Sequence, residues 1–198
     1  MYKMEKFSNL TVRAIVNMYK YVLSHPVPGL RIWMDENDIS IWYALIFDIP
    51  SADGAFDGGE YLIKFTIKET FPHSPPSAEF LTPNGIYSLG GRFCVSIGEF
   101  HSQNYRPDIG IDGYALAVKG SFMDRTIFAD HGGIRIELRD LNICKEMAVN
   151  SREYNKTYYG NIIENMNALS VAKPAEVSAK PLTLRERMAL KKQAQSIV

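Results

Sequence analysis

Residues 71–107 read FPHSPPSAEFLTPNGIYSLGGRFCVSIGEFHSQNYRP, and this stretch decides both the fold and the chemistry that we expect of the chain. It places Cys94, one of only two cysteines, on a short apolar segment just after a Gly-Gly pair. A proline-rich bend and a Thr-Pro-Asn-Gly turn precede that segment, and a polar loop with His101 follows it. Asn84 and His101 are within chain reach of the thiol, a combination that favours acyl transfer over plain core packing.

The composition excludes several classes of protein. A length of 198 residues, with 46% hydrophobic and 12% aromatic residues, is typical of one globular domain with a tail. The 22 basic and 22 acidic residues cancel, so we expect no nucleic-acid partner and no attraction to an anionic membrane. The first residues lack a secretory signal, and no apolar run is long enough for a transmembrane segment. The sequence predicts a soluble, cytoplasmic protein and leaves a nuclear location open.

Metal chemistry fits the sequence poorly. The two cysteines and four histidines lie scattered, without the CxxC or HxxxH spacing that gathers tetrahedral ligands. We therefore expect no metal and no cofactor, and both thiols are expected to be reduced. Cys144 lies in a helical pattern with Leu141 and Ala148, where packing inside the domain is the stronger interpretation.

The first part of the chain predicts a helix followed by an antiparallel meander, which is an α+β arrangement. Residues 8–24 form the helix, which Ser8 or Asn9 caps. Its expected apolar face consists of Leu10, Ala14, Met18 and Tyr21, with Val22 beside them. The four predicted strands are residues 30–34, 39–49, 60–68 and about 77–81.

The remainder of the chain predicts a long loop, more helices and a tail. Residues 82–110 have little regular structure, and a segment of that length in a compact domain tends to be functional. Helices are expected at 111–123, 137–153 and 156–168, with a loop at 125–133. From Ser170 onward a proline-punctuated linker leads to a capping box that opens a short helix at 183–197. We therefore predict a catalytic core at 1–169 and a linker with a short helix at 170–198.

Taken in order, these elements and motifs resemble the ubiquitin-conjugating enzymes, and the resemblance covers roughly residues 8–168. Its markers are Trp42, Phe56 before Gly58-Gly59, Phe71-Pro72-x-x-Pro75-Pro76, Pro83-Asn84, and Cys94 followed by Val95-Ser96-Ile97. The chain looks most like the branch that is usually anchored in the endoplasmic reticulum by its tail. That branch has Thr-Pro-Asn-Gly, as at 82–85, and a Phe-His pair like Phe100-His101. The tail LRERMALKKQAQSIV is too charged to span a membrane.

The resemblance implies that Cys94 accepts ubiquitin as a thioester from a ubiquitin-activating enzyme. Transfer to an acceptor amine or hydroxyl follows, directly or with a ligase. Asn84 would stabilise the oxyanion, or would only hold its turn, and the two roles are compatible. His101 would orient or deprotonate the acceptor, or would only be a solvated loop residue. The same fold also leaves open a non-catalytic ubiquitin- or partner-binding module and a carrier of another ubiquitin-like modifier.

The loops that dock ligases in the family depart from its pattern here. The residues expected to bind partners are Phe71, His73, Pro75, Tyr105, Pro107 and Asp108. Family members have Trp-Asn-Pro-Ala or Trp-Ser-Pro-Ala in the second loop, whereas this chain has Tyr-Arg-Pro-Asp at 105–108. His73 stands where an aromatic residue is common. A buried unpaired charge is costly, so we expect an atypical ligase with a basic group opposite Asp108, or loops that are simply solvated.

Overall fold

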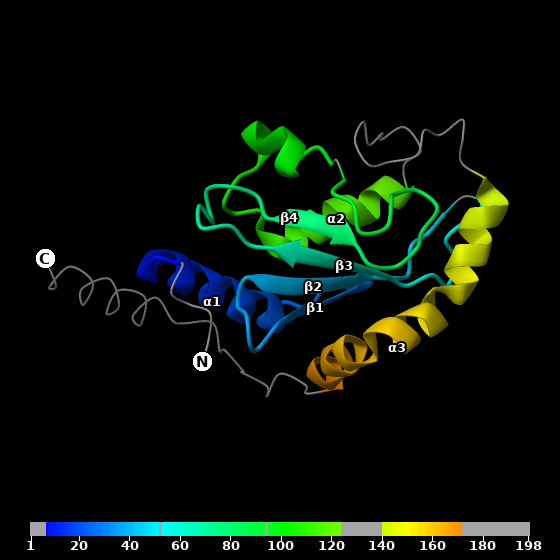
Figure 1. Cartoon of the computed structure of the whole chain (residues 1–198), viewed down its shortest axis with the longest axis horizontal. Coiled ribbons are helices and arrows are strands. Elements are labelled where there is room, and N and C mark those ends of the chain that lie inside the picture. The colour runs from blue at the N-terminus through cyan, green and yellow to red at the C-terminus, as the bar shows by residue number, and fades with distance from the viewer. Residues whose placement is uncertain (1–6, 52, 94, 124–139, 172–198) are drawn as a thin grey trace, which may run out of the picture.

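The computed structural model describes residues 7–51, 53–93, 95–123 and 140–171. The elements are α1 (Asn9–Ser24), β1 (Leu30–Met34), β2 (Ile41–Ile46), β3 (Tyr61–Thr66), β4 (Ser77–Phe80), the 3-10 helix η1 (Glu99–Asn104), α2 (Gly110–Met123) and α3 (Leu141–Val171). The strands form one antiparallel sheet in the order β1-β2-β3-β4 (Figure 1). The predicted fold class is therefore confirmed.

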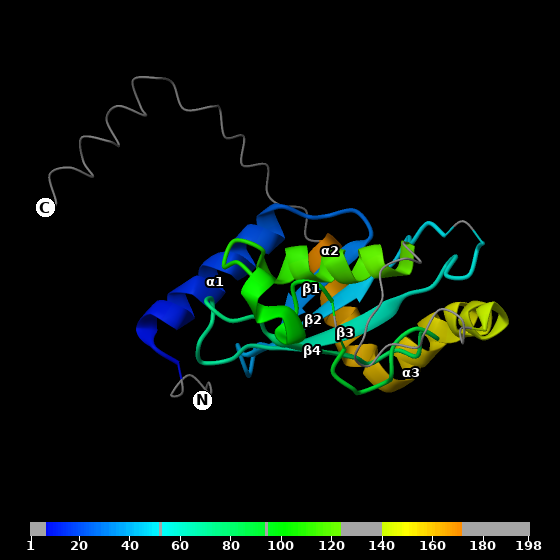
Figure 2. The ribbon, with the colours of Figure 1, turned by 90° about the horizontal axis from the view of Figure 1, so that it is seen from above.

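One face of the sheet packs on α1 and α2. Ile32, Ala44, Ile63 and Phe80 are aligned across the four strands, so their side chains share this face. All four side chains are buried in the main hydrophobic core. Figure 2 shows α1 and α2 on the same side of the sheet, and the first part of α3 adds Cys144 and Ala148 to the same core. Trp42 is fully buried in this core, and its Nε1 donates to the carbonyl of Ile39 at 2.9 Å.

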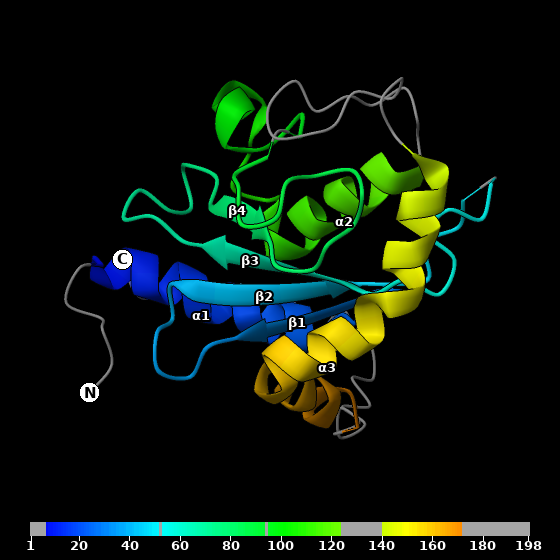
Figure 3. The same ribbon diagram turned by 45° about the vertical axis from the view of Figure 1, so that its right-hand side comes forward.

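The opposite face of the sheet is covered by the end of α3. Trp33, Leu45 and Leu62 lie on that face and form a second buried cluster with Met166. Figures 1 and 3 show α3 passing along one end of the sheet and then turning back beside β1. The helix has non-helical backbone angles at Tyr159 (φ −135°, ψ 26°), which is where its two parts meet. The end of α3 thus packs the second face, while the start of α3 contributes to the main core with α1 and α2.

The predicted apolar face of the first helix is wrong in part. Leu10 and Tyr21 are 77% and 54% exposed, whereas the buried residues of α1 are Thr11, Ile15 and Val22, of which the spacing predicts only Val22. Apolar residues occur on more than one side of this helix, so spacing alone did not identify the side that meets the sheet. The predicted cap is confirmed, because the Ser8 hydroxyl accepts a hydrogen bond from the Thr11 amide at 3.1 Å.

Two other predictions need correction. The long loop at 82–110 includes η1, so it is more regular than expected. The predicted gap between helices at residues 154–155 is absent, because α3 continues through it. Asn155 does not end the helix, since its side chain is buried and bonds to other parts of the domain. The expected loop at 125–133, the start of a helix at 137 and the helix at 183–197 lie outside the described residues.

Candidate functional site

The backbone on both sides of position 94 is anchored in the core, although Cys94 itself lies outside the described residues. The ring of Phe93 is 2% exposed and lies 4.6 Å from the ring of Phe80 and 4.9 Å from that of Tyr87, measured between centroids. Val95 is also buried. The segment that carries the candidate nucleophile is therefore attached to the sheet through its neighbours.

The Asn84 side chain holds the turn at 82–87. Its Oδ1 accepts hydrogen bonds from the amides of Ile86 at 2.9 Å and Tyr87 at 2.7 Å. Its Nδ2 donates to the carbonyl of Thr82 at 3.2 Å, and the residue is only 1% exposed. The turn-holding role considered from the sequence is therefore present. An amide nitrogen carries two hydrogens, and within the described ranges only the one donated to Thr82 has a hydrogen-bond acceptor, so the other is available as a donor.

Gly85 brings this turn against α3. Its φ of +75° lies in the left-handed region, and an added Cβ would lie 2.6 Å from Sγ of Cys144. Glycine therefore satisfies both the backbone angle and the close approach of the helix. Cys144 is fully buried at this contact, which confirms its predicted packing role.

A carboxylate that the sequence did not single out joins three segments around position 94. Oε1 of Glu99 lies 2.5 Å from Nζ of Lys68 and 3.1 Å from Nη1 of Arg92. Lys68 follows β3, Arg92 precedes position 94, and Glu99 opens η1. The partners are 31 and 7 residues away in the chain, so no local motif reveals the cluster.

His101 lies within η1 and is half-buried. Its backbone amide donates to the carbonyl of Gly98 at 3.0 Å. The end of the same helix is tied back by Asn104, whose Nδ2 donates to the carbonyl of Ser96 at 2.9 Å. The helix that carries His101 is thus bonded to the segment directly after position 94, while Asn84 belongs to the turn before it.

The six residues expected to bind partners divide into two groups. Phe71, Pro75 and Tyr105 are buried, whereas the other three, His73, Pro107 and Asp108, are exposed. Burial, with a smaller contribution from the charge of Asp108, raises the pKa of Tyr105 to about 12.

The Asp108 carboxylate already has a cation beside it. Its Oδ1 lies 3.2 Å from Nε of Arg106, and both side chains are largely exposed, at 70% and 73%. A solvated pair within the loop satisfies Asp108 without a basic partner opposite it.

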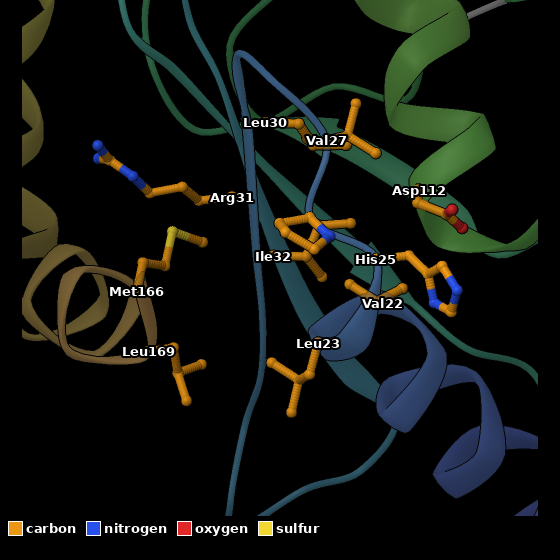
Figure 4. Close-up of a pocket in the computed structure, with 11 residues that line it drawn as sticks. Val22, Leu23, His25, Val27, Leu30, Arg31, Ile32, Asp112, Met166 and Leu169 are labelled. Atoms are coloured by element: carbon orange, nitrogen blue, oxygen red, sulfur yellow. The ribbon is translucent and has the colours of Figure 1, made fainter. Parts of the chain in front are cut away.

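A separate pocket of about 100 Å³ lies between the end of α1, β1 and the end of α3 (Figure 4). Its lining is mainly apolar and includes Val22, Leu30, Ile32, Met166 and Leu169. It contains none of the predicted site residues, so it is distinct from the region around position 94.

Among the described residues, no group of three or more His, Cys, Asp or Glu side chains is placed to hold a metal ion. None of the helices in the described part of the chain combines the length and the apolar character needed to cross a bilayer.

The family model described as "Ubiquitin-conjugating enzyme" matches residues 15–119, more than half of the 198-residue chain. The chain belongs to the ubiquitin-conjugating enzyme family. The matched residues run from α1 to α2. They include the Asn84 turn, position 94 and η1.

Individual relatives of this ubiquitin-conjugating family member are distant. "Ubiquitin-conjugating enzyme E2 6" of Candida glabrata is 28% identical over 95 residues, which are 48% of this chain and 38% of that protein. "Ubiquitin-conjugating enzyme E2 J1" of Homo sapiens is 29% identical over 119 residues, 59% of this chain and 37% of that protein. "Ubiquitin-conjugating enzyme E2 J2-like" of Dictyostelium discoideum is 22% identical over 140 residues, 71% of this chain and 80% of that protein. The matches to the first two thus span less than half of those relatives.

Proposed function

We propose that this chain is an active ubiquitin-conjugating enzyme with Cys94 as its nucleophile. The Cys94 thiolate attacks the thioester carbonyl of ubiquitin held by a ubiquitin-activating enzyme. A new thioester forms on Cys94, and the thiol of the activating enzyme leaves. An acceptor amine or hydroxyl then attacks the same carbonyl, loses its proton to a base, and releases the Cys94 thiolate. The chemistry needs no cofactor within the chain.

Asn84 and His101 are proposed to assist this transfer. The second hydrogen of the Asn84 amide is the candidate donor to the oxyanion, while the first holds the turn. His101 is the candidate base or orienting group for the acceptor. The observation that carries the proposal is the arrangement inside the family fold: a fixed Asn84 turn, then core-anchored neighbours of Cys94, then η1 bonded back to that segment.

The finer assignments are also proposals. Thr-Pro-Asn-Gly at 82–85 and Phe100-His101 favour the branch that is usually tail-anchored in the endoplasmic reticulum. The catalytic core is proposed at 1–169, with the linker and short helix at 170–198. Any ligase that binds this chain would be atypical, because the exposed residues of the chain's docking loops are His73 and the Arg106–Asp108 pair, together with Pro107.

A charging assay tests the proposal. The protein is incubated with activating enzyme, ATP and ubiquitin, and the product is separated without reductant. We expect a reductant-sensitive adduct that Cys94→Ala abolishes and that Cys144→Ala, which removes the other thiol, retains. Cys94→Ser is expected to give an ester that survives reductant. Absence of an adduct with ubiquitin or any related modifier contradicts the proposal and favours a binding module. An adduct with another modifier alone identifies the chain as a carrier of that modifier.

Acceptor preference is measured by adding free lysine, serine or threonine to the charged enzyme. If His101 acts on the acceptor, His101→Ala slows discharge while charging is unchanged. Equal discharge rates for wild type and His101→Ala would remove this role from the histidine.

A further inference from the structure

We propose that Thr82 and Asn155 are positioning residues for the Asn84 amide. A buried hydrogen-bond network connects α3, through the Thr82 hydroxyl, to the turn that holds Asn84. The inference rests on the proposed function, because it assigns the network to the donor that would stabilise the oxyanion. Thr82 and Asn155 are distinct from the thiol, from His101 and from the docking loops.

The Thr82 hydroxyl completes the pairing of β3 with β4. The amide of Leu81 donates to the carbonyl of Leu62 at 2.8 Å, as in a normal ladder. The amide of Leu62 then donates to Oγ1 of Thr82 at 2.9 Å, where a backbone carbonyl would ordinarily accept. Oγ1 in turn donates to Oδ1 of Asn155 at 2.5 Å. The hydroxyl thus accepts one bond and donates another, which a valine side chain cannot do.

Asn155 and its neighbour one turn earlier fix α3 to the start of β3. Nδ2 of Asn155 donates to the carbonyl of Glu60 at 2.9 Å. The amide of Glu60 donates to Oγ of Ser151 at 2.9 Å, and that hydroxyl donates to the carbonyl of Ala148 at 2.7 Å. Both side chains are 1% exposed. Since buried polar groups are costly when unpaired, this network defines one position of the helix against the sheet.

Thr82 links the position of α3 to that of the Asn84 side chain, because it is hydrogen-bonded to both. Its hydroxyl is bonded to α3, and its carbonyl accepts the hydrogen bond from Nδ2 of Asn84 at 3.2 Å. The far end of the turn is also seated on α3, where Gly85 meets Cys144. The direction of the second Asn84 amide hydrogen is therefore set from both ends of the turn. A shift of about 1 Å in a catalytic group can cost about 100-fold in rate, so this support matters for transfer.

The test compares discharge of charged enzyme onto free lysine in a single turnover. We expect Thr82→Val and Asn155→Ala to discharge about 10-fold more slowly than wild type at equal charging. Thr82→Ser keeps the hydroxyl and is expected to retain the wild-type rate. Thr157→Val and Asn161→Ala are matched controls, because both residues are exposed on the same helix, and they are expected to discharge normally.

A double variant separates positioning from general stability. In an Asn84→Ala background the amide to be positioned is gone, so Asn155→Ala is expected to cause no further loss in discharge. A multiplicative loss in the double variant, or unchanged discharge in Thr82→Val and Asn155→Ala, overturns the inference while leaving the proposed function intact. Failure of the wild type to charge overturns both.

A spectroscopic measurement does not depend on activity or on the folding of Thr82→Val. The side-chain amide signals of Asn84 are assigned by NMR from their loss in Asn84→Ala. They are expected to shift in Asn155→Ala and to stay in place in Asn161→Ala. Unshifted Asn84 signals in folded Asn155→Ala would overturn the inference.

Discussion

The buried hydroxyl of Tyr105 is expected to lower the stability of the protein at high pH. The residue is 7% exposed, and its hydroxyl is buried with no hydrogen-bond partner among the described residues. Burial raises its pKa from the model-peptide value of about 10 to about 12. Replacing it by phenylalanine removes the ionisable group and keeps most of the ring volume.

The sign of the effect follows from the direction of the pKa shift. Below pH 10 the phenol is neutral in both states, so its ionisation does not change the free energy of unfolding. Between pH 10 and 12 the unfolded chain loses the proton while the folded protein keeps it, and stability falls as pH rises. At pH 11, one unit from each pKa, the loss for wild type is about 1.4 kcal/mol. Tyr105→Phe does not suffer this loss.

Urea unfolding at pH 8 and pH 11 measures the difference. At pH 8 the free energy of unfolding of Tyr105→Phe is expected to equal that of wild type or to exceed it by about 1 kcal/mol, because the substitution removes a buried hydroxyl that has no partner among the described residues. At pH 11 the advantage of the variant grows by about 1.4 kcal/mol. Tyr158→Phe is the control, since Tyr158 is 65% exposed and its replacement is expected to change neither value. An advantage that is the same at both pH values would refute the reasoning.

Four further substitutions test the packing, the turns and the ion pairs. Leu62→Ala, at a fully buried position under α3, is expected to lower the free energy of unfolding by about 2–5 kcal/mol in urea; a loss below about 1 kcal/mol would show that the helix does not cover it. In thermal unfolding, Gly90→Ala is expected to lower the free energy of unfolding by about 1–2 kcal/mol, because its φ is +67°. Gly85→Ala is expected to lower it more, because the added Cβ also meets Cys144. Equal losses for the two variants would exclude the clash. Glu99→Gln is expected to lower the free energy of unfolding by about 1 kcal/mol at low salt and by less in about 1 M salt. A loss that does not depend on salt would exclude a contribution from the ion pairs.

Features that depend on neighbouring residues could be predicted from the sequence. Ser8 caps α1 because a serine before a helix accepts from the amide three residues later. The first three strands follow from runs rich in Ile, Trp, Tyr, Phe and Leu between turns, although β2 and β3 are shorter than expected. Asn84 holding its turn follows from the same local chemistry.

Features that join distant segments could not be predicted. Thr82 and Asn155 are 73 residues apart, and neither belongs to a pattern that indicates a contact. Asn155 weakens a helical prediction by its intrinsic preference, and its tertiary bonds to Thr82 and Glu60 overcome that preference. The turn of α3 near Tyr159, and the sheet face that its second part covers, follow from packing that the sequence pattern left undetermined.

Both parts of α3 bury side chains, but only the part before Tyr159 makes buried hydrogen bonds to the Thr82 turn, and this separates their consequences. The part before Tyr159 makes directional hydrogen bonds from Ser151 and Asn155, so a substitution there changes where the Thr82 turn lies. The part after it mainly buries apolar side chains such as Met166, and its hydrogen bond to the sheet, from Arg31 to Asn167, is exposed and lies on β1, at the opposite edge from β4 and the Thr82 turn. Substitutions after Tyr159 should therefore lower stability while charged enzyme still discharges normally at temperatures where the domain is folded. Substitutions at Asn155 should slow discharge even in fully folded protein, so the two parts can be told apart by kinetics alone.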